Sequence, residues 1–139
     1  MMHIRTTLRR LWRDQRGFAT SFFLRTIIVF AIVALAINEV GQILMTEVHA
    51  HNAAGDAAQA AATQYKGTRN LQQAHLAAVN AMIGDDPKAK LVKLTINTTQ
   101  YTAIAVVRET ANTLVVSRVS FLQKYGQVEA SEEEVAPTA

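Results

Sequence analysis

The stretch from Thr20 to Met45 constrains this chain more than any other. Between Arg25 and Glu39 it holds about 13 uncharged and almost wholly apolar residues, and apolar character continues to either side. A helix that crosses a bilayer needs roughly 20 such residues. The sequence therefore predicts one transmembrane helix, with a short arm before the membrane and a small domain after it.

Charge is distributed unevenly along the chain. The net charge is +3, yet residues 1–25 contain six arginines against one acidic residue, whereas the rest holds eight basic and ten acidic side chains. Basic segments that flank a membrane helix stay in the cytoplasm. We therefore expect a cell-membrane protein with a basic cytoplasmic arm (1–20) and an extracytoplasmic C-terminal domain. The folded part lacks the basic stripe that nucleic-acid binding requires.

The arm has two interpretations. Ile4, Leu8, Leu11 and Trp12 lie on one face of a helix, with most arginines around the other side. Such a helix can lie on an anionic leaflet, where each basic residue contributes about 1 kcal/mol of binding. The alternative is an unstructured arm that only sets the topology.

Two positions of the membrane helix fit the sequence. A span of Phe18–Asn38 buries Arg25, and a span of about Leu24–Met45 puts Arg25 at the inner interface and Glu39 near the outer one. A central ionisable residue costs about 2.5–3.5 kcal/mol, so the second span is preferred. Arg25 and Glu39 lie roughly 21 Å apart along one helix. They are therefore either two membrane-interface anchors or partners across neighbouring subunits.

An alanine-rich stretch follows the membrane segment, and we expect one helix over 21–65. Alanine has the highest helix propensity, whereas Gly41 and Gly55 are possible bends. Small residues on one helix face allow another helix to approach closely. That packing face, expected to bury against neighbouring subunits, consists of Ala50, Ala54, Ala57 and Ala61.

A small domain is predicted over 66–131. Asn70 followed by Gln73 is typical of a helix N-cap, and Pro87 stops the helix that follows. The apolar period then changes to two, which predicts a hairpin of strands Lys90–Thr98 and Tyr101–Thr110.

The secondary structure of the last third of the chain has two interpretations at one segment. Residues 113–125 fit a helix by the spacing of their apolar side chains, or a strand by their β-branched content. Gln127–Ser131 is expected to be a third strand, and the acidic residues 132–139 a disordered tail. The predicted fold class is an α+β membrane protein with a long N-terminal transmembrane helix, a second helix and a small antiparallel sheet, similar to a pilin-like body.

Chemistry-bearing motifs are scarce. The chain has no cysteine, which excludes disulfides and thiolate metal sites. His49 and His51 form an H-x-H, but on a helix these side chains point about 200° apart, so they are expected to be solvated surface residues. No nucleophile motif or phosphate-binding loop occurs. We expect no catalytic, cofactor-binding or metal residues, no small-molecule substrate, and no enzymatic activity.

Processing of the N-terminus is a further possibility. Gly17-Phe18 after a basic leader resembles the cleavage site of type IV prepilins, whose members carry Glu at the fifth mature position, where this chain has Phe22. Ala34-Leu35-Ala36 offers a signal-peptidase site. An uncleaved anchor is the preferred interpretation.

Several motifs together resemble the TadE/TadG-like family of minor pilins and pilus-assembly proteins. The similar segments are the R-G-F-A start at Arg16, the apolar helix, the N-A-A-G-D-A-A-Q-A-A-A run from Asn52, and the pairs Thr113-Leu114 and Phe121-Leu122 with the V-E-A of 128–130. The chain is also similar to small single-pass membrane proteins of high-GC Gram-positive bacteria.

The resemblance implies a non-enzymatic minor pilin or accessory component of a Tad/Flp-type pilus or related secretion machine. Its partners would be membrane lipid and other membrane or pilus-assembly proteins, with further copies of itself as an option. The alternative is an anchor or accessory subunit of another cell-envelope complex, which binds its partner through the outer domain.

Overall fold

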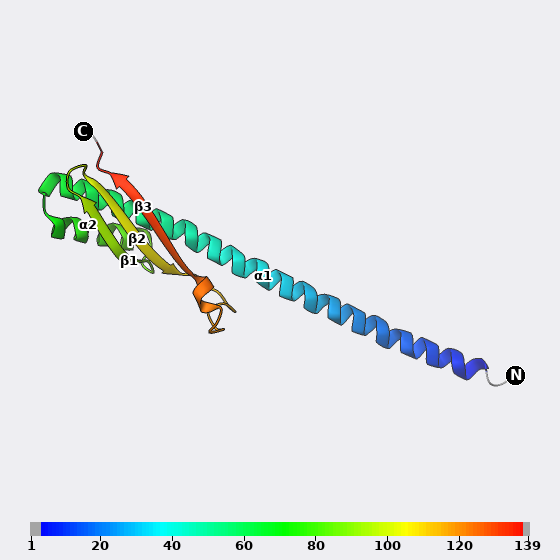
Figure 1. The fold of residues 1–139 in the computed structure, drawn as a ribbon. Coiled ribbons are helices and arrows are strands. Elements are labelled where there is room, and N and C mark those ends of the chain that lie inside the picture. Colours follow the sequence, from blue (N-terminus) through cyan, green and yellow to red (C-terminus); the bar gives the residue numbers. More distant parts are fainter. Residues whose placement is uncertain (1–3, 138–139) are drawn as a thin grey trace. The chain divides into compact units, whose positions relative to one another are not determined.

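The structure is a computed structural model that describes residues 4–137, with side chains from residue 20 onward. It contains the expected α+β elements (Figure 1). In chain order these are helix α1 (Ile4–Thr68), helix α2 (Leu71–Asp85), strands β1 (Lys90–Asn97) and β2 (Thr102–Thr110), the 3₁₀ turn η1 (Gln123–Gly126) and strand β3 (Gln127–Val135). The chain divides into two compact units, 1–38 and 39–139.

Helix α1 is longer than the sequence predicts. It begins at Ile4, so the arm is helical over 4–20, and the unstructured alternative is wrong for these residues. It also runs without interruption through Gly41 and Gly55. It ends after Thr68, where Arg69 takes a left-handed φ of 57° and donates its backbone N–H to the carbonyl of Tyr65 at 2.8 Å.

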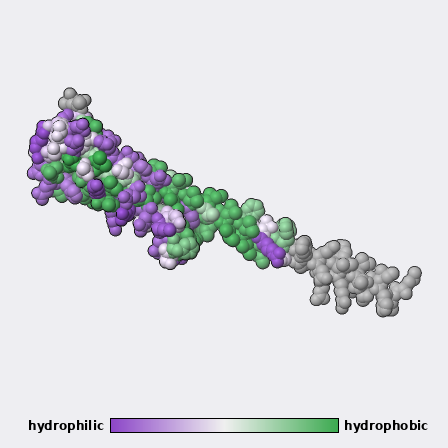
Figure 2. Space-filling view, in the orientation of Figure 1, coloured by the Kyte–Doolittle hydropathy of each residue, from purple (hydrophilic) through white to green (hydrophobic). Residues whose placement is uncertain are grey.

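The first unit presents large apolar side chains that are exposed in the described part of the structure. Within the described residues, the one helix with the length and apolarity to cross a membrane is α1 from Thr20, and none of its most apolar window is buried. Green apolar surface predominates along this part of α1 in the space-filling view, with one purple patch near the grey residues (Figure 2). A core helix of a soluble protein would be buried instead, whereas a signal sequence near the N-terminus would pass the same test.

The second unit is a three-stranded antiparallel sheet with helices packed on one face. The strand order is β1-β2-β3. Its core is built almost entirely from small residues, and Val107 is the largest side chain that is fully buried. The buried alanines come from the second half of α1, from α2 and from the sheet: Ala50, Ala53, Ala54, Ala57, Ala58, Ala61, Ala62, Ala74, Ala78, Ala103, Ala105 and Ala130. Helices and strands can therefore approach one another closely.

Helix α2 begins and ends where the sequence predicts. The Asn70 side chain accepts hydrogen bonds from the backbone N–H groups of Gln72 and Gln73, at 2.9 and 3.2 Å. The N–H of Asn70 itself donates to the Thr68 hydroxyl, and not to the Gln73 side chain as in a reciprocal capping box. The helix ends at Asp85, just before Pro87, and its apolar face is buried at Ala74, Ala78 and Met82.

The predicted hairpin is confirmed to within a few residues at its ends. The Asn97 carboxamide oxygen accepts the N–H groups of Thr99 and Gln100 in the turn, at 3.0 and 3.2 Å. A register shift between Leu91 and Lys93 puts two β1 residues against one β2 residue. Strict alternation with Leu94 and Ile96 would turn Val92 toward the core. Because of the bulge, Leu91 packs against the core instead and Val92 stays exposed.

The predicted disordered tail over 132–139 is wrong for the residues described. Strand β3 continues to Val135 and pairs with β2 throughout, with Glu132 opposite Ala105. Two interactions explain why this acidic sequence is ordered: Glu132 lies 2.6 Å from the His51 ring, and Ala136 donates its N–H to the Tyr101 carbonyl at 3.0 Å.

Residues 111–126, called the 111–126 loop below, form neither a regular helix nor a strand before η1. They make successive turns, such as Arg118 and Val119 donating to the Val115 carbonyl at 3.0 and 3.1 Å. Both interpretations of 113–125 are therefore wrong. The β-branched Val115, Val116 and Val119 disfavour a continuous helix.

Candidate functional site

Glu39 is the point where the 111–126 loop is attached to α1. Its carboxylate accepts three backbone hydrogen bonds, from Leu114 at 2.6 Å and from Val115 and Val116 at 3.1 Å each. The residue is only 6% exposed. Three N–H groups at the start of a turn need an acceptor, and an ionised carboxylate is a strong one.

The buried stripe of α1 begins at this glutamate. Glu39, Ile43, Thr46 and Ala50 follow one another at helical spacing, and all are buried or half-buried. The remaining faces of the same turns carry Val40, Leu44, Met45 and Val48, each more than half exposed. The start of the second unit therefore has one face covered by the domain and a broad apolar surface that the described chain leaves open.

The 111–126 loop carries exposed apolar groups of its own. Leu114, Phe121 and Tyr125 are 57%, 71% and 59% exposed. Basic Arg118 and Lys124 lie in the same segment, with the Lys124 ammonium 4.9 Å from the centre of the Tyr125 ring. Exposed aromatic and basic side chains together are typical of segments at a membrane–water interface.

The other residues expected at the membrane do not all fall in the described part of the chain. The possible processing site, Gly17-Phe18, lies outside the residues whose side chains are described. Arg25 lies on α1 in the first unit. Glu39 has its three hydrogen bonds within its own chain, a role that the sequence did not predict.

The alanine face of α1 has a different role from the one expected. Ala50, Ala54, Ala57 and Ala61 are fully buried within the core of their own domain. They are therefore not available to neighbouring subunits in this fold. The sequence signal for close packing was correct, but the partners are the strands and helix of the same chain, because Ala103, Ala105 and Ala130 give the sheet an equally small surface.

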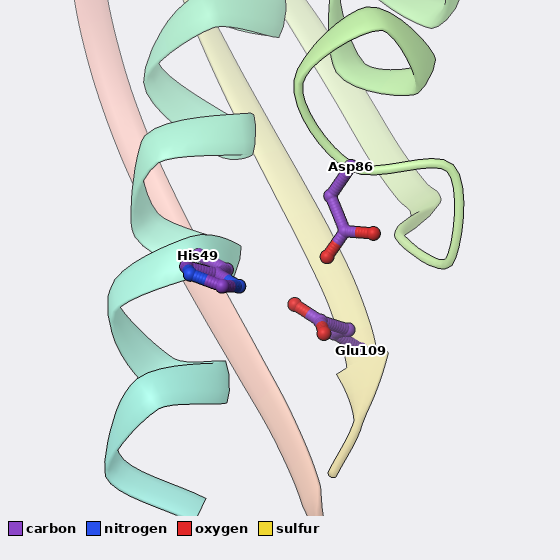
Figure 3. Close-up of side chains that lie close together, drawn as sticks. All are labelled: His49, Asp86 and Glu109. Atoms are coloured by element: carbon purple, nitrogen blue, oxygen red, sulfur yellow. The ribbon is translucent and has the colours of Figure 1, made fainter. Parts of the chain in front are cut away.

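A second group of polar side chains lies where α1, the end of α2 and the end of β2 meet. His49, Asp86 and Glu109 each have a potential ligand atom, and these atoms lie within 4.8 Å of one another (Figure 3). Asp86 and Glu109 are 8% and 5% exposed, whereas His49 is open to solvent. The sequence alone does not predict this group, because the three residues are far apart in the chain and share no motif.

Burial and charge repulsion act together on Glu109. Desolvation, a hydrogen bond with Asp86 and the Asp86 charge raise the pKa of the Glu109 carboxyl to about 7, against a smaller opposing effect of Lys88. One oxygen of this carboxyl, Oε2, is buried without a hydrogen-bond partner in the described structure. Two carboxyl groups therefore lie close together in a buried place, and one oxygen of Glu109 has no partner among the described residues.

His51 is separate from that group, as helical geometry predicts. Its Nδ1 lies 2.6 Å from the Glu132 carboxylate, and both side chains are exposed. This pair borders an open groove of about 430 Å³ lined mainly by polar and acidic residues: His51, Asn52, Gly55, Asp56, Gln59, Asp85, Glu132 and Glu134. The two histidines of the H-x-H motif thus have different partners.

Comparisons with protein-family models, curated proteins and solved structures found no match to this chain. The TadE/TadG-like resemblance therefore remains a prediction based on its motifs.

Proposed function

We propose that this chain is a non-enzymatic, single-pass membrane subunit of a larger cell-envelope assembly, namely a minor pilin or accessory component of a Tad/Flp-type pilus or related secretion machine. The observation that supports a subunit role is the extent of bare apolar surface on α1. Exposed apolar side chains continue from Phe22 to Val48, about 27 residues, whereas a bilayer needs about 20. The apolar residues beyond those in the bilayer require a protein partner to cover them.

The loop bound to Glu39 favours one of the two possible membrane spans over the other. A span of Leu24–Met45 would draw the 111–126 loop, with Arg118 and Lys124, into the hydrocarbon, where each charge costs about 2.5–3.5 kcal/mol. A span close to Phe18–Asn38 keeps the loop at the outer interface and lets Arg25 extend toward the inner one. We therefore favour a span close to Phe18–Asn38 over Leu24–Met45, which is the span that the sequence alone favours.

In this register Val40, Leu44 and Val48 lie beyond the hydrocarbon core. They form one stripe at a spacing of four residues and are each more than half exposed. An apolar stripe in water is a preferred protein contact. A neighbouring membrane subunit that continues alongside α1 would cover it, which is the packing role that a pilin-like subunit needs.

The 111–126 loop supports the same arrangement from the domain side. Phe121 and Leu114 would enter the headgroup layer, and Arg118 and Lys124 would meet lipid phosphates. The loop would thus set the distance and tilt of the domain at the membrane surface. Tryptophan in place of Phe121, in a Trp12→Phe background, should be quenched by brominated lipids; the exposed strand position Thr95 is the matched control.

Photo-crosslinking in the native membrane tests the proposal. A photoreactive residue replaces Leu44 or Val48 in the full chain, and Phe30 serves as the lipid-facing control. We expect protein adducts from Leu44 and Val48, with secretion ATPase and polytopic pilus-platform proteins in the same purified complex. Unrelated envelope partners would overturn the pilus assignment in favour of an anchor of another complex. Lipid adducts alone would overturn the subunit role.

A further inference from the structure

The three side chains at the meeting of α1, α2 and β2 form a partly enclosed polar site. His49 comes from α1, Asp86 is the residue that caps the end of α2, and Glu109 is near the end of β2. Figure 3 shows the three side chains directed toward one another. The carboxylates are buried and the imidazole is open to solvent, so the site is closed on the domain side and accessible from the other.

One of these three side chains has an unsatisfied oxygen. Oε2 of Glu109 is buried and has no hydrogen-bond partner in the described structure, although the residue is only 5% exposed. The charged groups that act on it are Asp86, Asp85 and Lys88, of which two are negative. Buried polar atoms in native proteins nearly always have partners, and an exception calls for an explanation such as an ion. A cation would satisfy this oxygen and offset the repulsion.

We propose that His49, Asp86 and Glu109 bind one divalent transition-metal ion. One imidazole nitrogen and two carboxylate oxygens match Zn²⁺ best, with Mn²⁺ as the weaker alternative. Ligands about 2.0–2.1 Å from a tetrahedral ion lie about 3.4 Å apart, so the present atoms need to close by little more than an ångström. Rotation of the exposed His49 ring provides that movement, and water completes the coordination on the open side.

The surroundings of Asp86 orient it for this role. Its backbone N–H binds the Met82 carbonyl at 2.8 Å, and its Oδ1 accepts the Lys88 N–H at 2.8 Å. These bonds leave Oδ2 for an ion. Glu109 is held by its strand position opposite Val128. Metal ligands are typically oriented by such outer hydrogen bonds.

The bound ion would have a structural effect. It would join α1 to the end of α2 and to β2 by direct bonds, in a domain whose core contains few large side chains. A ligand that binds only the folded state raises the melting temperature, and the rise grows with the logarithm of the ligand concentration above its Kd. Neither this effect nor the site depends on the proposed pilus assignment.

Metal binding by the full chain in detergent micelles tests the proposal. After chelation and dialysis, we expect one Zn²⁺ per chain by elemental analysis and a rise in melting temperature of about 5 °C or more at saturating Zn²⁺. Mg²⁺ and Ca²⁺ should give no shift, because they prefer shells made of oxygen alone. A chain that takes up no Zn²⁺ would overturn the site.

Variants assign the binding to His49 and Glu109. His49→Ala and Glu109→Gln should each weaken Zn²⁺ binding at least about tenfold; His49 is on the surface, and the glutamine keeps the shape of Glu109, so both variants should fold. His51→Ala and Asp85→Asn are the matched controls and should bind as the unsubstituted chain does. Loss of binding in His51→Ala, with binding kept in His49→Ala, would place the ion at the Glu132 groove and contradict the proposal.

Discussion

The two stretches of α1 on either side of Val48 are both apolar, yet they have opposite environments. From Phe22 to Val48 the helix carries Phe, Ile, Leu and Val side chains that are mostly half exposed or more. From Ala50 to Tyr65 it carries alanines that are fully buried. Side-chain size therefore separates the two stretches better than hydropathy does: large side chains face outward toward whatever surrounds the helix, and small ones let the chain fold back on itself.

The difference follows from how each stretch gains free energy. A large apolar side chain contributes about 1.5–3 kcal/mol when its area leaves water, in lipid or in protein. Alanine has little area to bury, so the second stretch depends on many close backbone and methyl contacts. Such a core tolerates neither gaps nor added volume. Substitutions that each stretch should tolerate differently test this distinction.

The largest effect is expected from a charge in the first stretch. Val29→Asp replaces an exposed apolar side chain near the middle of the proposed span, and should disfavour membrane insertion by about 3 kcal/mol. Fractionation of cells that express the full chain measures the loss. Gln59→Asp, on the exposed face of the alanine stretch, is the matched control and should leave membrane association unchanged. Equal membrane fractions for both variants would refute the membrane assignment of this stretch.

A larger side chain should destabilise the second stretch and leave the first nearly unaffected. Ala57→Leu forces three carbons into a site with no exposed area, and should lower the free energy of unfolding of the domain by about 2–3 kcal/mol. The same change at the exposed Ala31 should be nearly neutral. Denaturant unfolding in detergent, followed by circular dichroism, compares the two variants. A stable Ala57→Leu domain would mean that the alanine face is not tightly packed.

Local signals in the sequence were sufficient for much of this domain. Asn70 and Pro87 bound α2 because capping and proline geometry act within a few residues. The two strands of the hairpin follow from a period of two. The acidic end of β3 was mispredicted because its order comes from pairing with β2 and from His51, both distant in sequence. The bulge at Val92 likewise depends on the partner strand.

The functional groups were harder to predict for the same reason. Glu39 was placed near the outer interface from hydropathy, but its bonds to Leu114, Val115 and Val116 depend on a loop whose turns no periodic pattern reveals. His49 was dismissed because no local ligand accompanies it. Asp86 and Glu109 become its neighbours only once α2 and the hairpin fold against α1.

A pH effect should be confined to the domain that contains the second stretch. The pKa of Glu109 is about 7 in the folded chain against 4.5 for an ordinary glutamate, so the folded state binds more protons between these values. Stability should therefore fall as the pH rises from about 4.5 to 7, by about 2–3 kcal/mol in total, and stay low above 7.

Glu109→Gln removes this titration and should flatten the profile over that interval. The measurement uses denaturant unfolding of the full chain in chelator, in a His49→Ala background, so that neither a bound ion nor the adjacent imidazole contributes. Asp86, Asp85 and Lys88 remain in both proteins. Parallel pH profiles with and without Glu109 would show that its carboxyl titrates normally.

The smallest global effect, and the most local one, is expected at Glu39. Glu39→Gln leaves one oxygen to accept the three N–H groups of Leu114, Val115 and Val116, so at least one of them loses its acceptor. Amide hydrogen exchange in these three residues should accelerate severalfold while exchange in β2 stays unchanged. Glu47→Gln, an exposed glutamate on the same helix, is the matched control. Unchanged exchange at residues 114–116 would mean that the loop holds its position without Glu39, and the argument that places the outer membrane boundary at this residue would then fail.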